Sequence, residues 1–190
     1  MNQPNHPKQS DEWLMGQVAS GKQDCLAPLV RRYASPLLTY IERMVGDRHR
    51  AEELFQDVFL AVWAKRKTYK LPKPFRAWLF AIATNRCRAA FRRASPDVVL
   101  PLNEYSPESP ASAEPSPAAA AVATETANLV ARAVAGLPTQ QRTVVVLRNW
   151  NGLSYAEIAK VTGTTEGTVR SHMHHGLAGM RKYLEPRMKS

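Results

Sequence analysis

A segment rich in proline, alanine and serine near the middle of the chain constrains the fold more than any other feature. From Ser95 to Ala123 the sequence reads SPDVVLPLNEYSPESPASAEPSPAAAAVA. Each proline removes a backbone donor and disfavours helix, so an extended, semi-rigid linker is expected here. The chain is therefore predicted to form two modules, residues 24–93 and 127–190. A linker over residues 94–126 joins them, and a polar extension over residues 1–23 precedes them.

The charges divide along the same lines. The formal net charge is +10 and the pI is about 9.9. Residues 1–93 carry 17 Lys and Arg against 8 Asp and Glu, residues 94–127 carry five acids and no base, and residues 128–190 carry nine bases against three acids. Two basic modules on an acidic linker are typical of a protein that binds a polyanion. Charge alone leaves DNA, RNA and an anionic membrane surface open.

Two further features bear on location and redox state. No run of about 18 apolar residues is present, and the polar N-terminus lacks the apolar stretch of a signal peptide, so a cytoplasmic protein is expected. Cys25 and Cys87 are too few and too far apart in sequence for a disulfide framework or a zinc motif. They are expected to be reduced thiols.

The most specific pattern lies in the C-terminal module. Ser154 and Glu157 fit a capping box that begins a short helix, and Gly163 is expected to end it. Thr164 or Thr165 can cap a second helix that begins near Glu166. A helix, a short turn with glycine and a second helix form the helix-turn-helix pattern, in which the second helix enters the major groove. A helical hairpin used only for protein contact is the alternative.

The rest of this module is also predicted to be helical. One helix is expected at about residues 124–135, and another follows Leu137 and Pro138 and ends near Asn151 and Gly152. The last helix of the module has an apolar stripe at helical spacing, which is expected to face the core. The stripe consists of Val169, Met173, Leu177, Met180 and Leu184.

The N-terminal module is predicted to form three helices, at about residues 26–45, 50–63 and 75–93, which makes the whole chain all-α. Pro28 fits the first turn of the first helix, and Gly46 is expected to end that helix.

The second helix of this module has apolar side chains on nearly every side. Phe59, Leu60 and Trp63 extend its apolar surface beyond one stripe. A helix that is hydrophobic all round is covered on more than one side. The second cover is either another protein or the module's own core, and the pattern leaves both open.

The third helix and the loop before it are basic. Lys70 and Lys73 precede the helix, which carries several arginines interleaved with aromatic residues. Basic and aromatic side chains together suit unstacked, single-stranded bases as well as phosphates. Trp78 on its own fits the core better than a base platform.

The chain resembles the extracytoplasmic-function (ECF, group IV) sigma factors of the sigma-70 family, over three stretches in the family's order. These are LVRRYASPLLTYIERMVGDRHRAEELFQDVFLAVW, FRAWLFAIATNRCRAAFRR and LPTQQRTVVVLRNWNGLSYAEIAKVTGTTEGTVRSHMHHGLAGMRKYL. The resemblance implies two small all-α domains on a flexible linker, the C-terminal one a helix-turn-helix. It also implies a sigma factor that binds core RNA polymerase, directs it to specific promoters and helps to open the −10 region, and that is not itself an enzyme.

The resemblance also implies three sets of site residues. Core polymerase binding is assigned to Glu53, Leu54, Gln56, Asp57, Phe59, Leu60 and Trp63. Contacts with −10 DNA are assigned to Lys70, Phe75, Arg76, Trp78, Asn85, Arg86 and Arg88. Contacts with −35 DNA are assigned to Tyr155, Thr165, Thr168, Arg170, Ser171, His172, His174 and His175. No catalytic residue, metal or cofactor is expected.

The implied partners follow from the same resemblance. The N-terminal module would bind the clamp helices of the largest polymerase subunit, and another subunit region would hold the C-terminal module. Promoter DNA would be bound as a duplex at −35 and as a single strand at −10. The acidic linker would lie near the path of nascent RNA, and an anti-sigma factor is expected. No small-molecule substrate is implied.

The sequence departs from the family pattern at the recognition helix and in the linker. The family typically carries arginines where this chain has His172 and His175. Histidine is mostly neutral at pH 7, so the −35 preference should differ and binding should strengthen on mild acidification. The linker is also longer and richer in proline and alanine than the family pattern.

Three other classes of protein fit the sequence less well. A stand-alone activator or repressor would not explain the surface around Phe59 and Trp63. A recombinase needs a nucleophile among clustered arginines or paired carboxylates, and the N-terminal module shows no such set. A pure protein-interaction module fits poorly with a net charge of +10 and a capped helix-turn-helix.

Overall fold

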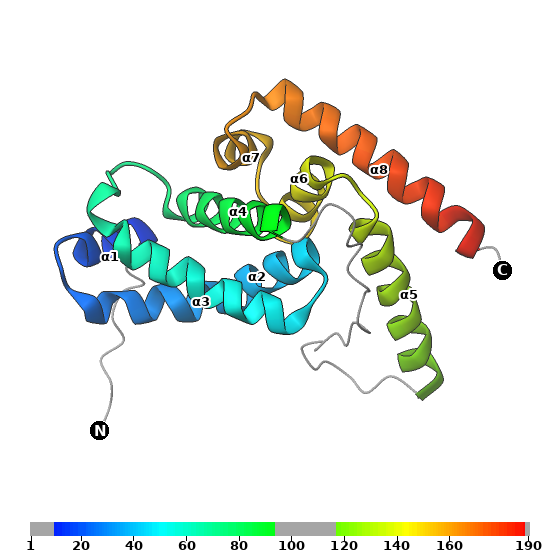
Figure 1. Cartoon of the computed structure of the whole chain (residues 1–190), viewed down its shortest axis with the longest axis horizontal. Helices are drawn as coiled ribbons and strands as arrows, with labels where there is room; N and C mark the ends of the chain where they lie inside the picture. Colours follow the sequence, from blue (N-terminus) through cyan, green and yellow to red (C-terminus); the bar gives the residue numbers. More distant parts are fainter. Residues whose placement is uncertain (1–9, 94–116, 189–190) are drawn as a thin grey trace.

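The computed structural model describes residues 10–93 and 117–188, and every regular element in these ranges is helical (Figure 1). The N-terminal module contains α1 (Asp11–Ala19), α2 (Leu26–Val45), α3 (Arg48–Ala64) and α4 (Phe75–Arg93), with short 3-10 turns at Gln23–Cys25 and Arg66–Thr68. The C-terminal module contains α5 (Pro117–Ala135), α6 (Thr139–Asn149), α7 (Tyr155–Thr162) and α8 (Glu166–Met188). The predicted all-α fold with a C-terminal helix-turn-helix is confirmed. No helix in the described part is long and apolar enough to span a membrane.

The N-terminal module is built around α2, α3 and α4. Its helix ends follow local signals: Gly46 ends α2 with a φ of 76°, and the Asp47 carboxylate caps α3 by accepting the Arg50 N–H at 2.6 Å. Tyr40 of α2 meets Phe80 of α4 edge to face, with ring centroids 5.4 Å apart. The interior is filled by apolar side chains at helical spacing, among them Leu37, Ile41, Val58, Val62, Leu79 and Ala83.

Helix α1 corrects the expectation of a polar extension over residues 1–23. Ser10 caps it by accepting the Trp13 N–H, and Leu14, Met15 and Val18 are buried in the N-terminal module. The segment is polar on average, but its three buried apolar residues lie within two turns and share one side. The folded module therefore includes a helix that the overall polarity of the segment concealed.

Helix α5 begins earlier than predicted. The predicted linker covered residues 94–126, whereas α5 is already helical from Pro117. Pro117 takes the first helical position, where its missing N–H costs nothing, and a run of alanines follows. The rest of the predicted linker, residues 94–116, lies outside the described residues.

The C-terminal module packs α8 across α6 and α7, as Figure 1 shows. Val169 and Met173 of the predicted stripe are buried and Met180 packs against the core, but Leu177 is 47% exposed, so its predicted core position is wrong. Gly176 takes that place: a Cβ on it would lie 2.7 Å from the Val145 side chain. Because Gly176 has no side chain, α8 approaches α6 closely there and Leu177 turns outward.

The two modules contact each other. Helix α4 packs against α7, and α2 packs against α6 (Figure 1). The Arg76 guanidinium donates to the Asn151 carbonyl, and the Asn151 side chain donates to the Pro36 carbonyl at 2.9 Å. Arg142 donates to the Met44 carbonyl at 2.7 Å, and Arg88 donates to the Gln140 side chain at 2.9 Å. We call this set of contacts the inter-module interface.

Candidate functional site

The first predicted set lies along α3, and the structure divides it into two groups. Leu54 and Phe59 are buried, 3% and 8% exposed, so they belong to the core of the N-terminal module. Leu60 is 66% exposed, although it is a large apolar residue. Phe59 is therefore a core residue, whereas Leu60 is not.

The polar members of this set surround Leu60 on the exposed face of α3. Glu53, Gln56 and Asp57 are exposed. Trp63, one turn after Leu60, is half-buried, and the Arg66 guanidinium lies 4.0 Å from its ring centroid. The structure thus brings one exposed leucine, a half-buried indole and an acidic rim onto one helical face, which suits contact with another protein.

The second predicted set lies on α4 and on the loop before it. Phe75 is fully buried and Trp78 is 7% exposed, and both pack with Tyr69 in an aromatic cluster. Phe75 and Trp78 are therefore core residues under the loop before α4 and do not form its exposed surface. Lys70 and Asn85 are exposed, and Arg86 is half-buried.

Two arginines of this second set are engaged by the C-terminal module. Arg76 and Arg88 are half-buried in the inter-module interface and donate to Asn151 and Gln140. In this arrangement the C-terminal module covers part of the arginine-bearing face of α4. Both guanidiniums are therefore engaged by the C-terminal module in this arrangement.

The helix-turn-helix is held by its caps. The Glu157 N–H donates to the Ser154 hydroxyl at 3.2 Å and the Ser154 N–H donates to the Glu157 carboxylate at 2.8 Å, which completes the predicted capping box. Gly163 ends α7 with a φ of 69°. Thr165 accepts the Thr168 N–H at 3.2 Å at the start of α8. Val169 in the first turn of α8 is fully buried, and α7 and α8 pack against each other.

This capping box predicts acid sensitivity. The Ser154 N–H that donates to the Glu157 carboxylate holds the pKa of Glu157 below its usual value of about 4.5. A depressed pKa stabilises the folded state above the usual pKa, and the effect is lost as the pH falls through the folded-state pKa. We expect wild type to melt higher than Glu157→Gln at pH 6, by an amount worth about 0.3–1 kcal/mol, and the gap to close towards pH 3. Melting curves at several pH values measure the gap, and a constant gap would contradict the assignment.

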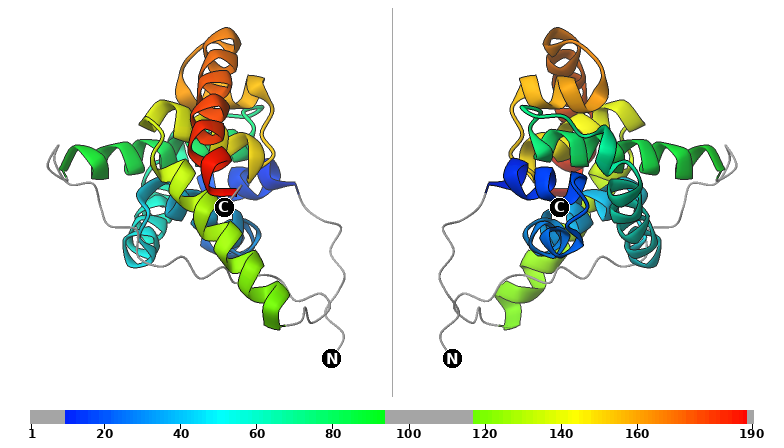
Figure 2. Two further views of the ribbon diagram at one scale, coloured as in Figure 1. Left: turned by 90° about the vertical axis from the view of Figure 1, so that its right-hand side faces the viewer. Right: turned by 90° about the vertical axis from the view of Figure 1, so that its left-hand side faces the viewer.

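The third predicted set lies mainly on the first half of α8. Figure 2 shows this part of α8, in orange, projecting at the end of the molecule away from α2 and α3. Thr165, Thr168, Arg170, Ser171, His174 and His175 are exposed, and His172 is half-buried. The structure therefore gathers most of the set on one free helical face.

Tyr155 supports this face from the start of α7. Two guanidiniums lie over its ring, that of Arg148 at 5.2 Å from the centroid and that of Arg170 at 5.6 Å. Arg170 also meets the Glu166 carboxylate at 3.4 Å. These contacts fix the position of the Arg170 side chain near the start of α8. Arg148 is a part of this arrangement that sequence reasoning did not include.

Sequence reasoning also missed two exposed apolar residues of the N-terminal module. Trp13 on α1 is 46% exposed and Leu71 in the loop before α4 is 61% exposed. The capping serine before α1 and the apolar spacing of Leu14 and Val18 would have revealed the helix that carries Trp13. Nothing in the local sequence indicated that Leu71 would be exposed.

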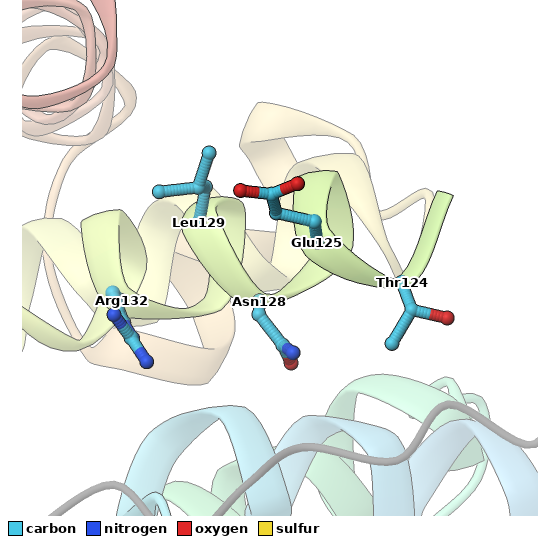
Figure 3. Close-up of a pocket in the computed structure, with 5 residues that line it drawn as sticks. All are labelled: Thr124, Glu125, Asn128, Leu129 and Arg132. Carbon is cyan, nitrogen blue, oxygen red and sulfur yellow. The ribbon is translucent and has the colours of Figure 1, made fainter. Parts of the chain in front are cut away.

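A separate pocket of about 480 Å³ lies along α5 (Figure 3). It is lined by Thr124, Glu125, Asn128, Leu129 and Arg132. None of the predicted site residues lines it. The exposed members of the three predicted sets lie on helical faces and on a loop, as expected for surfaces that contact macromolecules.

Comparisons with known proteins agree with this arrangement. Residues 29–96 match the family model described as sigma-70 region 2, and residues 127–180 match the model described as sigma-70, region 4. The chain is 31% identical to the ECF RNA polymerase sigma factor SigW of Bacillus subtilis strain 168, over 88% of this chain and 93% of that protein. It is 34% identical to the ECF RNA polymerase sigma factor SigE of Mycolicibacterium smegmatis, over 82% of this chain and 60% of that protein.

A solved structure gives the same picture of the fold. The structure of CnrH in complex with the cytosolic domain of CnrY matches with a TM-score of 0.72 and 26% sequence identity. The match covers 94% of this chain and 99% of CnrH. Both modules therefore have counterparts in one relative.

Proposed function

Because the chain belongs to the ECF sigma factors of the sigma-70 family, which direct RNA polymerase to promoters, we propose that its three surfaces divide this task between them. The exposed face of α3 binds the core enzyme. The loop before α4 and the exposed face of α4 bind the −10 strand. The first half of α8 binds the −35 duplex.

The exposed Leu60 carries the first assignment. A leucine that is two-thirds exposed between Gln56, Asp57 and Trp63 has no role in the module's own core. Burial of such a side chain against a partner stabilises the complex by about 1.5–3 kcal/mol. We place the clamp helices of the largest polymerase subunit on this face, and exclude Leu54 and Phe59 from direct contact because they are buried.

The second assignment requires the modules to separate. Lys70, Asn85 and Arg86 are at least partly accessible, whereas Arg76 and Arg88 are engaged in the inter-module interface. Binding of core polymerase to both modules would draw them apart and free both arginines. The −10 strand would then be held on α4 by cations and by the loop before it.

The third assignment uses α8 as the recognition helix. Arg170, Ser171, His174 and His175 lie on its exposed face, beyond the cap at Thr165. The N-terminal residues of a recognition helix contact base edges in the major groove. A second polymerase subunit region would hold this module, as the family resemblance implies.

Promoter opening in this scheme needs no catalytic residue in the chain. Unstacking a base costs a few kcal/mol, and contacts that exist only with the separated strand offset that cost. Nucleotidyl transfer belongs to the polymerase. We therefore propose that the protein is not an enzyme, uses no cofactor or small-molecule substrate, and acts in the cytoplasm with the polymerase.

An anti-sigma factor is part of the same proposal. The family resemblance implies one, and CnrH was solved in complex with the cytosolic domain of CnrY. A partner that holds the two modules together would keep Arg76 and Arg88 in the inter-module interface. Such a partner would block −10 binding without touching DNA.

Replacement of Leu60 by alanine tests the first assignment. We expect its affinity for purified core RNA polymerase to fall roughly 10- to 100-fold, because an apolar side chain is lost from the contact. The melting temperature should change little, since the side chain is exposed. Binding is measured with fluorescently labelled protein.

Leu71→Ala is the matched control for this experiment. Leu71 is a leucine of similar exposure, 61% against 66%, in the same module but in the loop before α4 rather than on α3. It should bind core polymerase like wild type. Equal affinities of Leu60→Ala and wild type would refute the assignment of α3.

A further inference from the structure

The turn between α6 and α7 is held by two helices of the N-terminal module. The Arg43 guanidinium of α2 lies 4.2 Å from the Trp150 ring centroid. The Asn151 side-chain amide donates to the Pro36 carbonyl of α2 at 2.9 Å, and the Arg76 guanidinium of α4 donates to the Asn151 main-chain carbonyl. Packing of the two modules therefore fixes this turn.

Inside the turn, an asparagine is followed by a glycine. Gly152 is exposed and has a φ of 63°, whereas Asn151 is only 5% exposed. The Oδ1 atom of Asn151 is buried and accepts no hydrogen bond from any residue that the structure describes. The amide group is thus held by a single hydrogen bond, and its acceptor, Pro36, belongs to the other module.

Asparagine is a thermolabile residue, most of all before glycine, because a neighbour without a Cβ lets its backbone nitrogen approach the asparagine side chain. The Gly152 nitrogen gives up its proton to water and attacks the side-chain carbonyl carbon of Asn151. A C–N bond closes a succinimide ring, the bond from that carbon to Nδ2 breaks, and Nδ2 leaves as ammonia with a proton from water. Water then opens the ring to aspartate or isoaspartate. Water is consumed, ammonia is released, and neither oxidant nor enzyme is needed.

The packed arrangement opposes this reaction. The Asn151 side chain must rotate until its carbonyl carbon lies over the Gly152 nitrogen, but its amide is held on Pro36. Its burial also keeps out the water that accepts the proton and opens the ring. Once the modules separate, Pro36 and Arg76 are removed together, and no described residue of the C-terminal module binds the amide.

The product of the reaction weakens the packing of the modules. A carboxylate at position 151 has no N–H to donate to Pro36, so oxygen would face oxygen there. Its charge would also lie at a site that is 5% exposed, where it is costlier than in water. Arg76 can offset this cost only by leaving the main-chain carbonyl that it binds. The separated arrangement is therefore favoured after the reaction.

We propose that Asn151 and Gly152 form a self-modifying site that the inter-module interface protects. Deamidation proceeds while the modules are apart, and its product keeps them from packing again. The chain thereby retains an irreversible mark of the separation. The protection follows from the packing alone, whereas separation on binding to core polymerase rests on the proposed function.

The first experiment follows the reaction in the full chain by peptide mass spectrometry at neutral pH. Arg142→Gln removes the donor to the Met44 carbonyl across the interface. It should raise the rate at Asn151 about 30-fold, a factor that corresponds to about 2 kcal/mol of lost inter-module contacts. The products should be a mixture of aspartate and isoaspartate. Asn149 is the internal control, since Trp150 follows it and its amide is held within α6, and its rate should stay unchanged.

Small-angle scattering and melting curves show whether each variant is opened or unfolded. Arg43→Gln is added to Arg142→Gln if scattering shows the modules still packed, because Arg43 is the other cation that α2 places on the turn. Gly152→Ala in the opened variant should slow the reaction roughly 10-fold, since a Cβ hinders the approach of the nitrogen.

Asn151→Asp tests the consequence, because it supplies the product directly. It should raise the ratio of separated to packed modules roughly 10-fold, through the lost hydrogen bond and the buried charge. Asn149→Asp is the matched control. It makes the same change in a side chain that is bound within α6, and should leave the modules packed as in wild type.

An equal rate at Asn151 in wild type and in the opened, folded variant would overturn the protection by the interface. Packing of Asn151→Asp as in wild type, or tighter through Arg76, would overturn the consequence. The holoenzyme distinguishes this inference from the proposed function. Faster deamidation there supports both. Faster deamidation in the opened variant but not in the holoenzyme would support the self-modifying site and contradict separation of the modules by core polymerase.

Discussion

Replacement of Arg142 by glutamine is expected to open the inter-module interface and to raise the affinity of the free protein for single-stranded −10 DNA. The Arg142 guanidinium extends from α6 to the Met44 carbonyl near the end of α2, and lies 5.6 Å from the Phe91 ring of α4. It also donates to the Ala135 and Leu137 carbonyls of its own module. Arg142 is half-buried, and this burial lowers the pKa of its guanidinium. One side chain therefore contacts α2 and α4 across the interface and the end of α5 within its own module.

The size of the effect follows from these contacts. A hydrogen bond to a charged group contributes about 1.5–3 kcal/mol, and a cation–π contact about 0.5–1 kcal/mol. A loss of about 2 kcal/mol from the inter-module contacts shifts the ratio of separated to packed modules roughly 30-fold. Separation frees Arg76 and Arg88 from Asn151 and Gln140, so strand binding should rise by up to the same factor.

Arg148→Gln is the matched control for Arg142→Gln. Arg148 also lies on α6 and donates to a carbonyl, that of Leu153 at 3.0 Å, but within its own module. It should leave the packing of the modules unchanged. Small-angle scattering measures separation, and anisotropy measures strand binding. If Arg142→Gln remains folded and binds the strand no better than wild type, the inter-module interface does not limit access to α4.

Local signals made much of the fold predictable. The end of α2, the start of α7 and the turn between α7 and α8 were predicted correctly, because Gly46, the pair Ser154 and Glu157, and Gly163 act on neighbouring backbone groups. Such interactions depend on residues a few positions apart. Sequence alone is therefore sufficient to place them.

The exposed face of α3 could be predicted only in part. Phe59 and Leu60 are adjacent apolar residues, yet one is 8% exposed and the other 66%. Which of them is covered depends on where α2 and α4 lie around the helix, and these neighbours are distant in sequence. The sequence showed that α3 has more apolar residues than one buried face needs, but it did not show that Leu60 would be the exposed one.

The inter-module interface left no signal in the sequence. Arg76, Arg142 and the Asn151 side chain all donate to backbone carbonyls. Every residue has a backbone carbonyl, so no particular residue type marks the position that accepts these hydrogen bonds. Arg76 and Arg88 were predicted to contact DNA, but in the structure they donate to Asn151 and Gln140 of the C-terminal module.

Gly176 shows the same limit inside one helix and leads to the second prediction. The apolar spacing of α8 placed Leu177 in the core, but the close approach of α6 made Gly176 the buried residue. A Cβ on Gly176 would lie 2.7 Å from the Val145 side chain and 3.5 Å from the Gln141 Cβ. Val145 is fully buried and β-branched, so it has little freedom to move. Either α8 shifts away from α6 or Val145 leaves its rotamer.

Gly176→Ala is therefore expected to destabilise the C-terminal module, although alanine is the better helix former. Overpacking costs about 1–3 kcal/mol, and the gain in helix propensity offsets about 1 kcal/mol of that. The matched control is Gly167→Ala on the same helix, where a Cβ meets nothing closer than the Thr165 hydroxyl at 3.7 Å. It should stabilise the module by up to about 1 kcal/mol.

The two substitutions are chemically identical, so their opposite signs isolate the packing of α8 on α6. Chemical denaturation measures both free energies of unfolding. A shift of α8 would also move Arg170 and His174 relative to Tyr155, so Gly176→Ala should lose −35 affinity in the holoenzyme even where it remains folded. Equal stabilisation by both alanines would show that α6 leaves room for a Cβ at position 176. The exposure of Leu177 would then need another cause.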